Sequence, residues 1–286
     1  MTGTRGETRA GVLAEMPIYR ALFSAVFQQH LQYRVPAVAG ALTNIAFGFF
    51  RLFLLTAFYE ASSAPQPMPL SDVYSYLWFG QVLFSVMPIT GVLGADAEEI
   101  RTGEVAYRLT RPISIYAFYF ARVLGRKATA LCTRSLFQVL AIFLLFPLLG
   151  IARYGMEPPA VSLLPFLIPS LALAVLLSVA IQNFIYMGAF WMISIRGAAT
   201  MSYAVIGLFS GLLVPLSFFP PVFGTVARLL PFSGIYDTPA MVYTGTFSPA
   251  EAAVGIVHQV VWLGLIVLAG ATLARRGTAR LEVAGG

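Results

Sequence analysis

The feature that most restricts the fold of this chain is a run without any charged side chain, from Pro158 to Ile195. It exceeds the roughly 20 apolar residues that an α-helix needs to cross a bilayer. Other apolar runs recur along the chain, and only 10% of all residues are charged, against roughly a quarter in soluble proteins. Such a composition cannot cover a globular surface with polar groups, so the sequence predicts an all-α membrane protein.

The apolar runs predict six transmembrane helices within one transmembrane domain, residues 37–273. The predicted spans are about 37–58, 73–94, 131–152, 165–190, 199–218 and 252–273. Residues 219–250 are also apolar, but Pro220, Pro221, Pro231 and Pro239 interrupt them. Because proline breaks helices, this stretch predicts short helices sheltered by protein or dipping into the interface. Polar tails, 1–16 and 274–286, complete the chain.

Residues 17–35 predict an amphipathic helix bounded by Pro17 and Pro36. Its polar stripe repeats every fourth residue and consists of Arg20, Ser24, Gln28 and Gln32. A helix of this kind is too polar to span a bilayer and suits the membrane surface. Ordinary packing against the bundle fits the same pattern, and both can hold together.

The basic residues predict how the chain is oriented. Six spans place both termini on one side, and of the 18 Lys and Arg residues only Arg153 and Arg228 fall on the other side, with Arg51 inside a span. Positive charge accumulates on the cytoplasmic side, so both termini are predicted to be cytoplasmic. This bias also accounts for the net charge of +6, and we therefore expect no nucleic-acid partner.

Charge is concentrated in one segment, residues 95–114, which we call the elbow. Its charged residues are Asp96, Glu98, Glu99, Arg101, Glu104, Arg108 and Arg111. Asp96 can cap a helix with Glu99 at the third position. Glu98 with Arg101, and Glu104 with Arg108, have the spacing of ion pairs on a helix surface.

The rest of the elbow predicts its shape. Gly103 permits a bend between two short helices, Pro112 ends the element, and Ile100, Val105 and Leu109 give it an apolar side. The segment could be a solvated loop that only sets topology. Four acidic groups, helix signals and apolar side chains instead favour docking to a soluble partner.

The motif "EEIRTGEVAYRLTRPISIYAFYFAR" in and after the elbow resembles the cytoplasmic segment of ABC-2 type ABC transporter permeases, in the six-span branch of that family. "LLPFSGIYDTPAMVYTG", the "QVVWL" of the last span and the ending "RLEVAGG" resemble the same branch. The resemblance covers nearly the whole chain. It implies a multi-pass transmembrane subunit of an exporter in the bacterial plasma (cell inner) membrane.

The resemblance also implies roles for individual segments. Residues 17–35 would be a connecting helix, and 219–250 short outward helices before the last span. The elbow would be a coupling helix that fits a groove in a separate ABC ATPase subunit, through Glu98, Glu99, Arg101, Gly103, Glu104, Val105, Arg108 and Arg111. A second permease, identical or different, would complete the membrane unit.

The chain itself is not predicted to be an enzyme. A phosphate-cradling loop needs the pattern G-x-x-x-x-G-K-[ST], and the sole lysine, Lys127 in "GRKAT", lacks it. We therefore expect no cofactor bound by this chain, with ATP and Mg²⁺ bound by the partner ATPase.

Three sets of residues within the spans are candidates for function. Arg51 could face a substrate path or the partner permease, or its side chain could extend outward towards Glu60. Gln182 and Asn183 could line a substrate path or form hydrogen bonds between helices. Gly207 and Gly211 form a G-x-x-x-G motif that predicts dimer packing.

The sequence also bears on two other functional classes. A self-contained secondary transporter of amphipathic molecules usually places acidic residues or broken helices at mid-membrane. Here every acidic residue lies at or beyond a predicted span end. An intramembrane enzyme would need a catalytic cluster, and the predicted spans contain none.

Overall fold

The computed structural model describes residues 4–32, 34–63, 65–87, 94–110, 113–192 and 194–284. All regular elements in these ranges are helices, which confirms the all-α class. The α-helices are α1 (Thr4–Leu31), α2 (Arg34–Ala61), α3 (Leu70–Leu83), α4 (Gly94–Arg101), α5 (Ile115–Ala130), α6 (Leu136–Leu140), α7 (Phe146–Leu148), α8 (Leu164–Gly188), α9 (Ile195–Phe209), α10 (Pro221–Leu229), α11 (Asp237–Tyr243) and α12 (Pro249–Ala284).

Tighter and wider turns complete the helical structure. The 3₁₀ turns are η1 (Phe84–Val86), η2 (Glu104–Thr110), η5 (Ala152–Tyr154), η6 (Val161–Leu163), η7 (Ala189–Trp191), η8 (Leu216–Phe218) and η9 (Pro231–Gly234). The π turns are η3 (Leu131–Ser135) and η4 (Ala141–Leu145).

Four helices in the described residues are long and apolar enough to cross a membrane: Val35–Ala61, Ile115–Leu148, Val161–Trp191 and Pro249–Arg280. The other two predicted spans correspond to shorter helices, α3 and α9. At about 1.5 Å per residue, the 15 residues of α9 reach only about 22 Å, against about 30 Å of hydrocarbon. Six spans remain a prediction.

The second of these four helices differs most from the predicted span, which was 131–152. It runs without a break from Ile115 to Leu148, through η3 and η4. Basic residues near the start of this helix would by themselves favour a position at the membrane interface. They fit within the helix because their side chains turn towards acidic residues and carbonyl groups. Lys127, for example, is buried and donates to the carbonyls of Val86 and Met87 at 2.8 and 2.9 Å.

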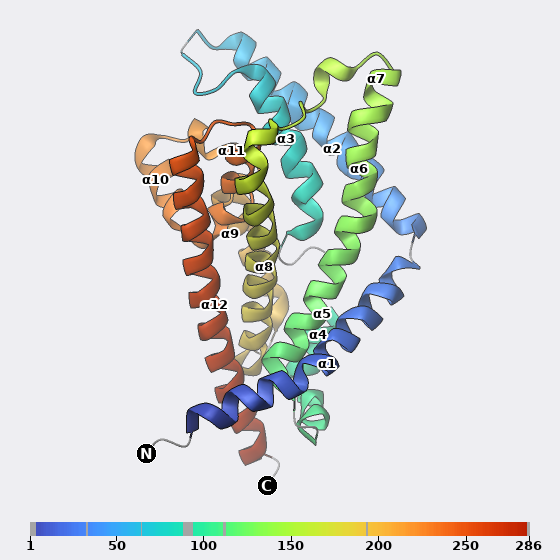
Figure 1. The fold of residues 1–286 in the computed structure, drawn as a ribbon, viewed down its shortest axis with the longest axis vertical. Coiled ribbons are helices and arrows are strands. Elements are labelled where there is room, and N and C mark those ends of the chain that lie inside the picture. The colour runs from blue at the N-terminus through green and yellow to red at the C-terminus, as the bar shows by residue number, and fades with distance from the viewer. Residues whose placement is uncertain are drawn as a thin grey trace.

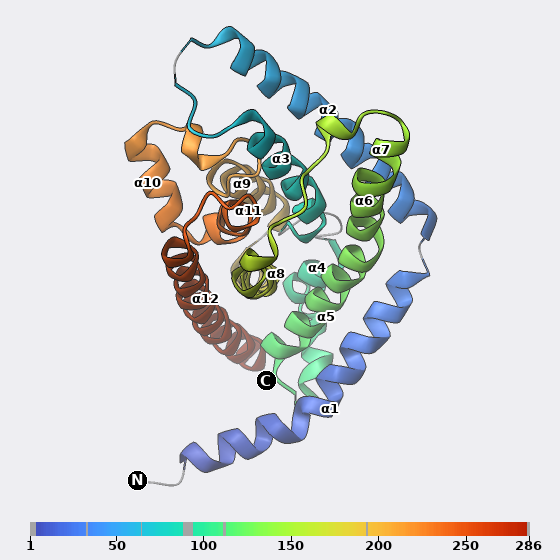
Figure 2. The same cartoon turned by 45° about the horizontal axis from the view of Figure 1, so that its top comes forward.

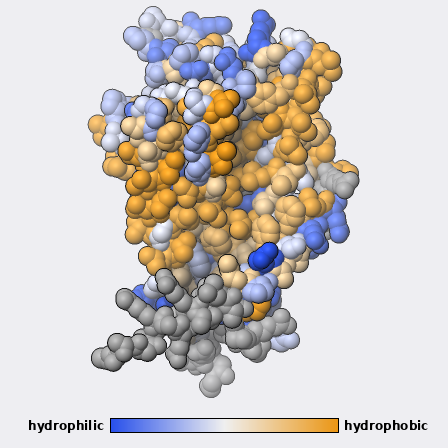
Figure 3. Space-filling view, in the orientation of Figure 1, coloured by the Kyte–Doolittle hydropathy of each residue, from blue (hydrophilic) through white to orange (hydrophobic). Residues whose placement is uncertain are grey.

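The long helices form a bundle with α1 laid across one end (Figure 1). The start of α1 and the last turn of α12 lie at this same end, and α4 lies beside α5 near it. The loop between α2 and α3, together with α7, lies at the opposite end (Figures 1 and 2). Figure 3 shows a broad hydrophobic belt over the middle of the molecule and a hydrophilic cap at the end opposite the termini. This distribution is that of a membrane protein.

Helix α1 is longer than the predicted amphipathic helix. It begins at Thr4, passes through Pro17 and ends at Leu31. It packs closely on α5, since an added Cβ at Gly125 would lie 3.1 Å from the Phe23 carbonyl oxygen. Thr129 donates to the Phe27 carbonyl at 3.2 Å. Packing against the bundle, one of the two readings of this helix, is therefore observed.

Two hydrophobic cores fill the bundle. The larger contains Tyr76, Trp78, Leu177 and Met241, and lies towards the end away from the termini. The smaller joins the elbow to α5 and α8 through Ala97, Ile100, Val105, Tyr119 and Tyr186. Charged groups cluster beside the smaller core, and they form the candidate site.

Candidate functional site: the charged elbow

The elbow consists of two short helices joined by a glycine turn. Helix α4 ends at Arg101, Gly103 adopts a left-handed φ of 80°, and η2 follows. Ala97, Ile100 and Val105 are buried against α5 and α8. The predicted bend at Gly103 and the predicted apolar side are therefore confirmed for these residues.

Part of the elbow's charge faces outward. Glu98 and Arg101 are exposed and form the predicted ion pair, and Glu104 is also exposed. The hydrogen bond to Glu98 raises the pKa of Arg101. These side chains are available to a neighbouring molecule at little cost, because exposed ion pairs stabilise a fold only weakly.

The remaining acidic groups face inward and attach the elbow to α5. Asp96, only 3% exposed, lies 2.9 Å from Arg122 and 2.5 Å from Arg126. Glu99 pairs with Arg108 and lies 3.4 Å from Arg122. The same charged segment therefore presents one face to solvent and holds the other against the bundle.

Two details of the predicted elbow are wrong. Asp96 lies within α4, which begins at Gly94, so its carboxylate forms ion pairs and is not the helix cap. Arg108 pairs with Glu99 rather than with Glu104, because η2 has three residues per turn and places residues four apart on different faces. Arg111 lies outside the described residues.

Sequence reasoning missed the largest exposed side chain of the elbow. Tyr107, on η2, is 79% exposed. Exposed aromatic rings are common anchors of protein interfaces. The signal available in the sequence was a tyrosine between the alanine and arginine of "EVAYR", which an apolar-versus-polar pattern does not distinguish from a core position.

Helix α1 touches the point where the chain leaves the elbow. The Ser114 amide donates to the Tyr19 hydroxyl at 3.0 Å, and that hydroxyl donates to Glu15. Burial and the bond to Glu15 raise the pKa of Tyr19 to about 12, so the hydroxyl keeps its proton at neutral pH. Helix α1 and the elbow are therefore linked directly.

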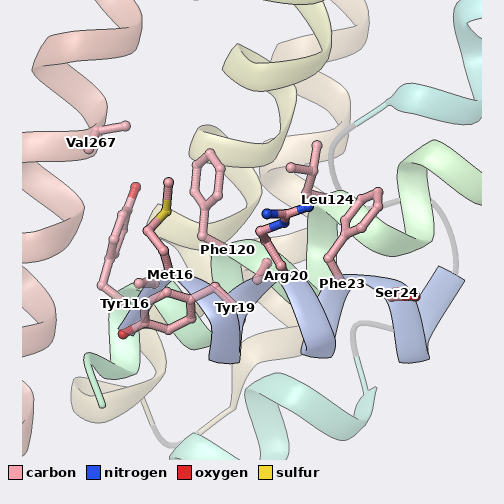
Figure 4. Close-up of a pocket in the computed structure, with 11 residues that line it drawn as sticks. Met16, Tyr19, Arg20, Phe23, Ser24, Tyr116, Phe120, Leu124 and Val267 are labelled. Carbon is pink, nitrogen blue, oxygen red and sulfur yellow. The ribbon is translucent and has the colours of Figure 1, made fainter. Parts of the chain in front are cut away.

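An apolar pocket of about 670 Å³ lies beside this link, between α1, α5 and α12. Tyr116, Phe120 and Phe23 supply rings to it, and Arg20 extends between Phe120 and Leu124 (Figure 4). A pocket of this composition suits apolar chains.

The sequence matches a known family over most of its length. The family model described as "ABC-2 family transporter protein" matches residues 45–285, which include the elbow and the helices from α3 to α12. The chain belongs to this family. It is thus an ABC-2 type transporter permease, and permeases of this family are generally non-catalytic membrane components that work with an ATPase subunit. No curated protein matches the chain significantly.

Within the ABC-2 permease, Arg51 is tied to a break in the helical structure. Its Nη1 donates to the Leu212 carbonyl at 3.1 Å, just beyond the end of α9. This contact lies within the chain, and it gives a hydrogen-bond donor to a backbone carbonyl three residues beyond the end of α9.

The polar pair on α8 also bonds within the chain. Asn183 donates to the Tyr116 carbonyl on α5 at 3.1 Å, and Gln182 donates to Tyr186 at 2.8 Å. Hydrogen bonding between helices, one of the two readings of this pair, is observed for Asn183. A role in a substrate path stays a prediction.

The G-x-x-x-G motif does not lie on one helix face. Helix α9 ends at Phe209, and Gly211 follows it with a φ of 84°. A Cβ at Gly211 would lie 2.4 Å from the Tyr76 hydroxyl oxygen, so this glycine serves a turn inside the chain. Gly207 remains within α9, and its dimer role stays a prediction.

Sequence reasoning also missed a buried carboxylate, Asp237, in the segment 210–243 that we call the broken segment. Its side chain is 1% exposed, lies 3.4 Å from Arg228 and accepts a 3.3 Å hydrogen bond from the Leu216 amide. The Tyr76 hydroxyl is 3.0 Å from both Asp237 Oδ1 and the Gly211 carbonyl. Asp237 thereby fixes the irregular backbone where α9 stops.

The described residues contain no cluster of His, Cys, Asp and Glu able to hold a metal ion.

Proposed function

We propose that this ABC-2 permease is the membrane subunit of an ATP-driven exporter, and that its elbow docks into a groove of a separate ABC ATPase subunit. ATP and Mg²⁺ are bound by that subunit. A second permease, a copy of this chain or a related one, completes the unit in the bacterial plasma membrane, with both termini and the elbow in the cytoplasm.

One observation carries the proposal: the elbow has two faces, one exposed and one bound to the bundle. Outward, it presents Glu98, Arg101 and Tyr107 to a soluble surface. Inward, Asp96 and Glu99 bind arginines of α5 and η2, and Ile100 packs in the smaller core. A displacement applied to the outer face therefore reaches α5, whose helix continues to Leu148.

The basic residues support the orientation, because the elbow lies near the end of the bundle that carries both chain ends. The export direction follows from the family resemblance. Cargo would enter from the cytoplasm or the inner leaflet and leave outward as the ATPase dimer closes.

Co-purification tests this function. The tagged permease is expressed with a candidate ABC ATPase subunit from the same genome, as wild type and as the double charge reversal Glu98→Arg with Arg101→Glu. The control, Glu60→Arg with Arg153→Glu, makes the same change of charge at exposed residues of the opposite end.

We expect the elbow variant to lose most of the bound ATPase and its permease-dependent stimulation, while the control retains both. Equal ATPase recovery from both variants, with monodisperse elution, would contradict docking at the elbow. Uphill transport by the permease alone, reconstituted without an ATPase, would favour a secondary transporter.

A further inference from the structure

A second cavity, lined by cations, lies on the other side of α5 from the pocket of Figure 4. It has a volume of about 430 Å³, and its charged or titratable lining consists of His30, Asp96, Arg122, Arg126, Lys127 and Arg134. We call it the basic cavity. Its volume lies within the range of small-molecule sites.

The charges that line the basic cavity do not balance. Asp96 is the one carboxylate among its lining residues, and both Arg122 and Arg126 share it. Glu99, beside the cavity, is already paired with Arg108. Counting these neighbours as well, the arginine and lysine side chains outnumber the carboxylates by three.

Two of the basic side chains form no ion pair with a carboxylate in the described residues. The Lys127 ammonium donates to the neutral carbonyls of Val86 and Met87. The Arg134 Nε is buried and has no hydrogen-bond partner in the described residues. A buried donor without a partner costs free energy unless a ligand or water satisfies it.

The backbone makes room for Arg134. Its guanidinium lies against Gly40 of α2, where an added Cβ would be 2.8 Å from Nε and 2.9 Å from Nη2. Arg134 itself lies in the π turn η3, a distortion that is frequent at functional sites. The arginine is therefore held in place by a close approach of two helices.

The basic cavity lies at the level where the surface helix meets the first span. Gln29 and His30 near the end of α1 line it, and a smaller cavity of about 150 Å³ shares His30, Arg126 and Arg134 with it. This smaller cavity extends to Pro36 and Ala37 in the first turn of α2. With α1 at the membrane surface, as its sequence predicts, this junction lies at the depth of lipid headgroups, where basic pockets between helices bind anionic lipids.

We propose that the basic cavity binds a phosphate group, with Arg134 as its principal ligand and Arg126 and Lys127 as neighbouring cations. Guanidinium groups bind phosphate oxygens with paired, charge-assisted hydrogen bonds. The phosphate comes from an anionic lipid headgroup or from a free phosphate ion. The site does not depend on the ATPase coupling proposed above.

Thermal unfolding of the purified full chain in detergent tests this site, because a ligand of the folded state raises the unfolding temperature. The titrants are dioleoylphosphatidylglycerol, dioleoylphosphatidylcholine, and sodium phosphate against sodium chloride of equal ionic strength. The variants are Arg134→Gln and Gly40→Ala, which displaces Arg134 but keeps every charge. Their matched controls are Arg276→Gln, an exposed arginine of α12, and Gly264→Ala, where a Cβ meets nothing within 4 Å.

We expect phosphatidylglycerol to stabilise the wild type more than phosphatidylcholine does, and Arg134→Gln to bind it about tenfold more weakly. Gly40→Ala should also weaken binding, whereas both controls bind as the wild type does. A lipid effect without a phosphate effect identifies a headgroup as the source, and an equal effect of sodium phosphate identifies the free ion.

Three results would overturn the proposal. The first is wild-type stabilisation that is equal for both lipids and absent with phosphate. The second is unchanged affinity in both Arg134→Gln and Gly40→Ala. The third is a loss in Arg276→Gln as large as in Arg134→Gln, because that would indicate general surface charge.

Discussion

The elbow and the broken segment each contain a buried carboxylate, but different kinds of group bind the two carboxylates. Asp96 is held by two arginine side chains at the edge of the basic cavity. Asp237 is held by a tyrosine hydroxyl, a backbone amide and one arginine, inside the larger core. Ion pairs between side chains can shift or exchange partners, whereas a carboxylate bonded to backbone fixes the path of the chain. The comparison indicates that the elbow is adjustable and the broken segment is rigid.

The largest effect is expected from Asp237→Ala, which removes one acceptor for Tyr76 and the acceptor for the Leu216 amide. Leaving the buried Leu216 amide without an acceptor and Arg228 without its carboxylate should lower the free energy of unfolding by about 3 kcal/mol, while the Tyr76 hydroxyl keeps the Gly211 carbonyl as acceptor. Asp237→Asn keeps one oxygen acceptor and should lose less. Chemical unfolding in detergent measures both. If Asp237→Ala has the same free energy of unfolding as the wild type, the contacts of Asp237 do not hold the broken segment rigid.

The next effect is expected from Gly211→Ala. A side chain at a φ of 84° is strained, and its Cβ would meet the Tyr76 hydroxyl. We therefore expect the free energy of unfolding to fall by about 2 kcal/mol. Gly207→Ala lies within α9 and should instead stabilise by up to about 1 kcal/mol. Unfolding curves and the oligomeric state are measured together. Equal weakening of a dimer by both variants would restore the G-x-x-x-G motif as a dimer contact.

A smaller effect is expected from Asp96→Asn in the elbow. Its arginine partners Arg122 and Arg126 are partly exposed. The free energy of unfolding should therefore fall by about 1–2 kcal/mol at low salt. Because salt screens such pairs, the loss should shrink in 1 M salt, whereas that of Asp237→Ala should persist. Unfolding at two salt concentrations distinguishes them. A salt-independent loss in Asp96→Asn would make the two regions alike.

The smallest effect on stability is expected from Glu98→Gln combined with Arg101→Gln. This pair is exposed, so the unfolding temperature should not change. The recovery of the ATPase subunit should fall, because the pair lies on the proposed docking face. A lower unfolding temperature with full ATPase recovery would assign the pair to stability rather than to docking.

The sequence predicted the helical class and four of the long helices because apolar length is a local property. It could not show that α9 ends before Gly211, since Pro215 and Gly211 are both compatible with a membrane helix. The burial of Asp237 depends on Tyr76, which is 161 positions away in the chain. No local pattern contains such a contact.

The elbow also contains contacts that its local sequence does not predict. Charge, Gly103 and the apolar residues were sufficient to predict a bent, two-faced segment. Which charges face inward was not predictable, because Glu99 and Asp96 bind arginines of η2 and α5 that only the folded chain brings near. The outward position of Tyr107 depends equally on this packing.

The most direct test of the account is the labelling of Tyr107→Cys in a Cys132→Ala background, which removes the one natural cysteine. A membrane-impermeant maleimide is applied to inverted vesicles and to intact cells, with and without the ATPase subunit, and Glu60→Cys serves as the control for the opposite end. The account predicts that Tyr107→Cys is labelled only in inverted vesicles and is protected when the ATPase subunit is present, while Glu60→Cys is labelled only from outside the cell. Labelling of Tyr107→Cys from outside, or labelling from inside that the ATPase subunit leaves unchanged, would contradict it.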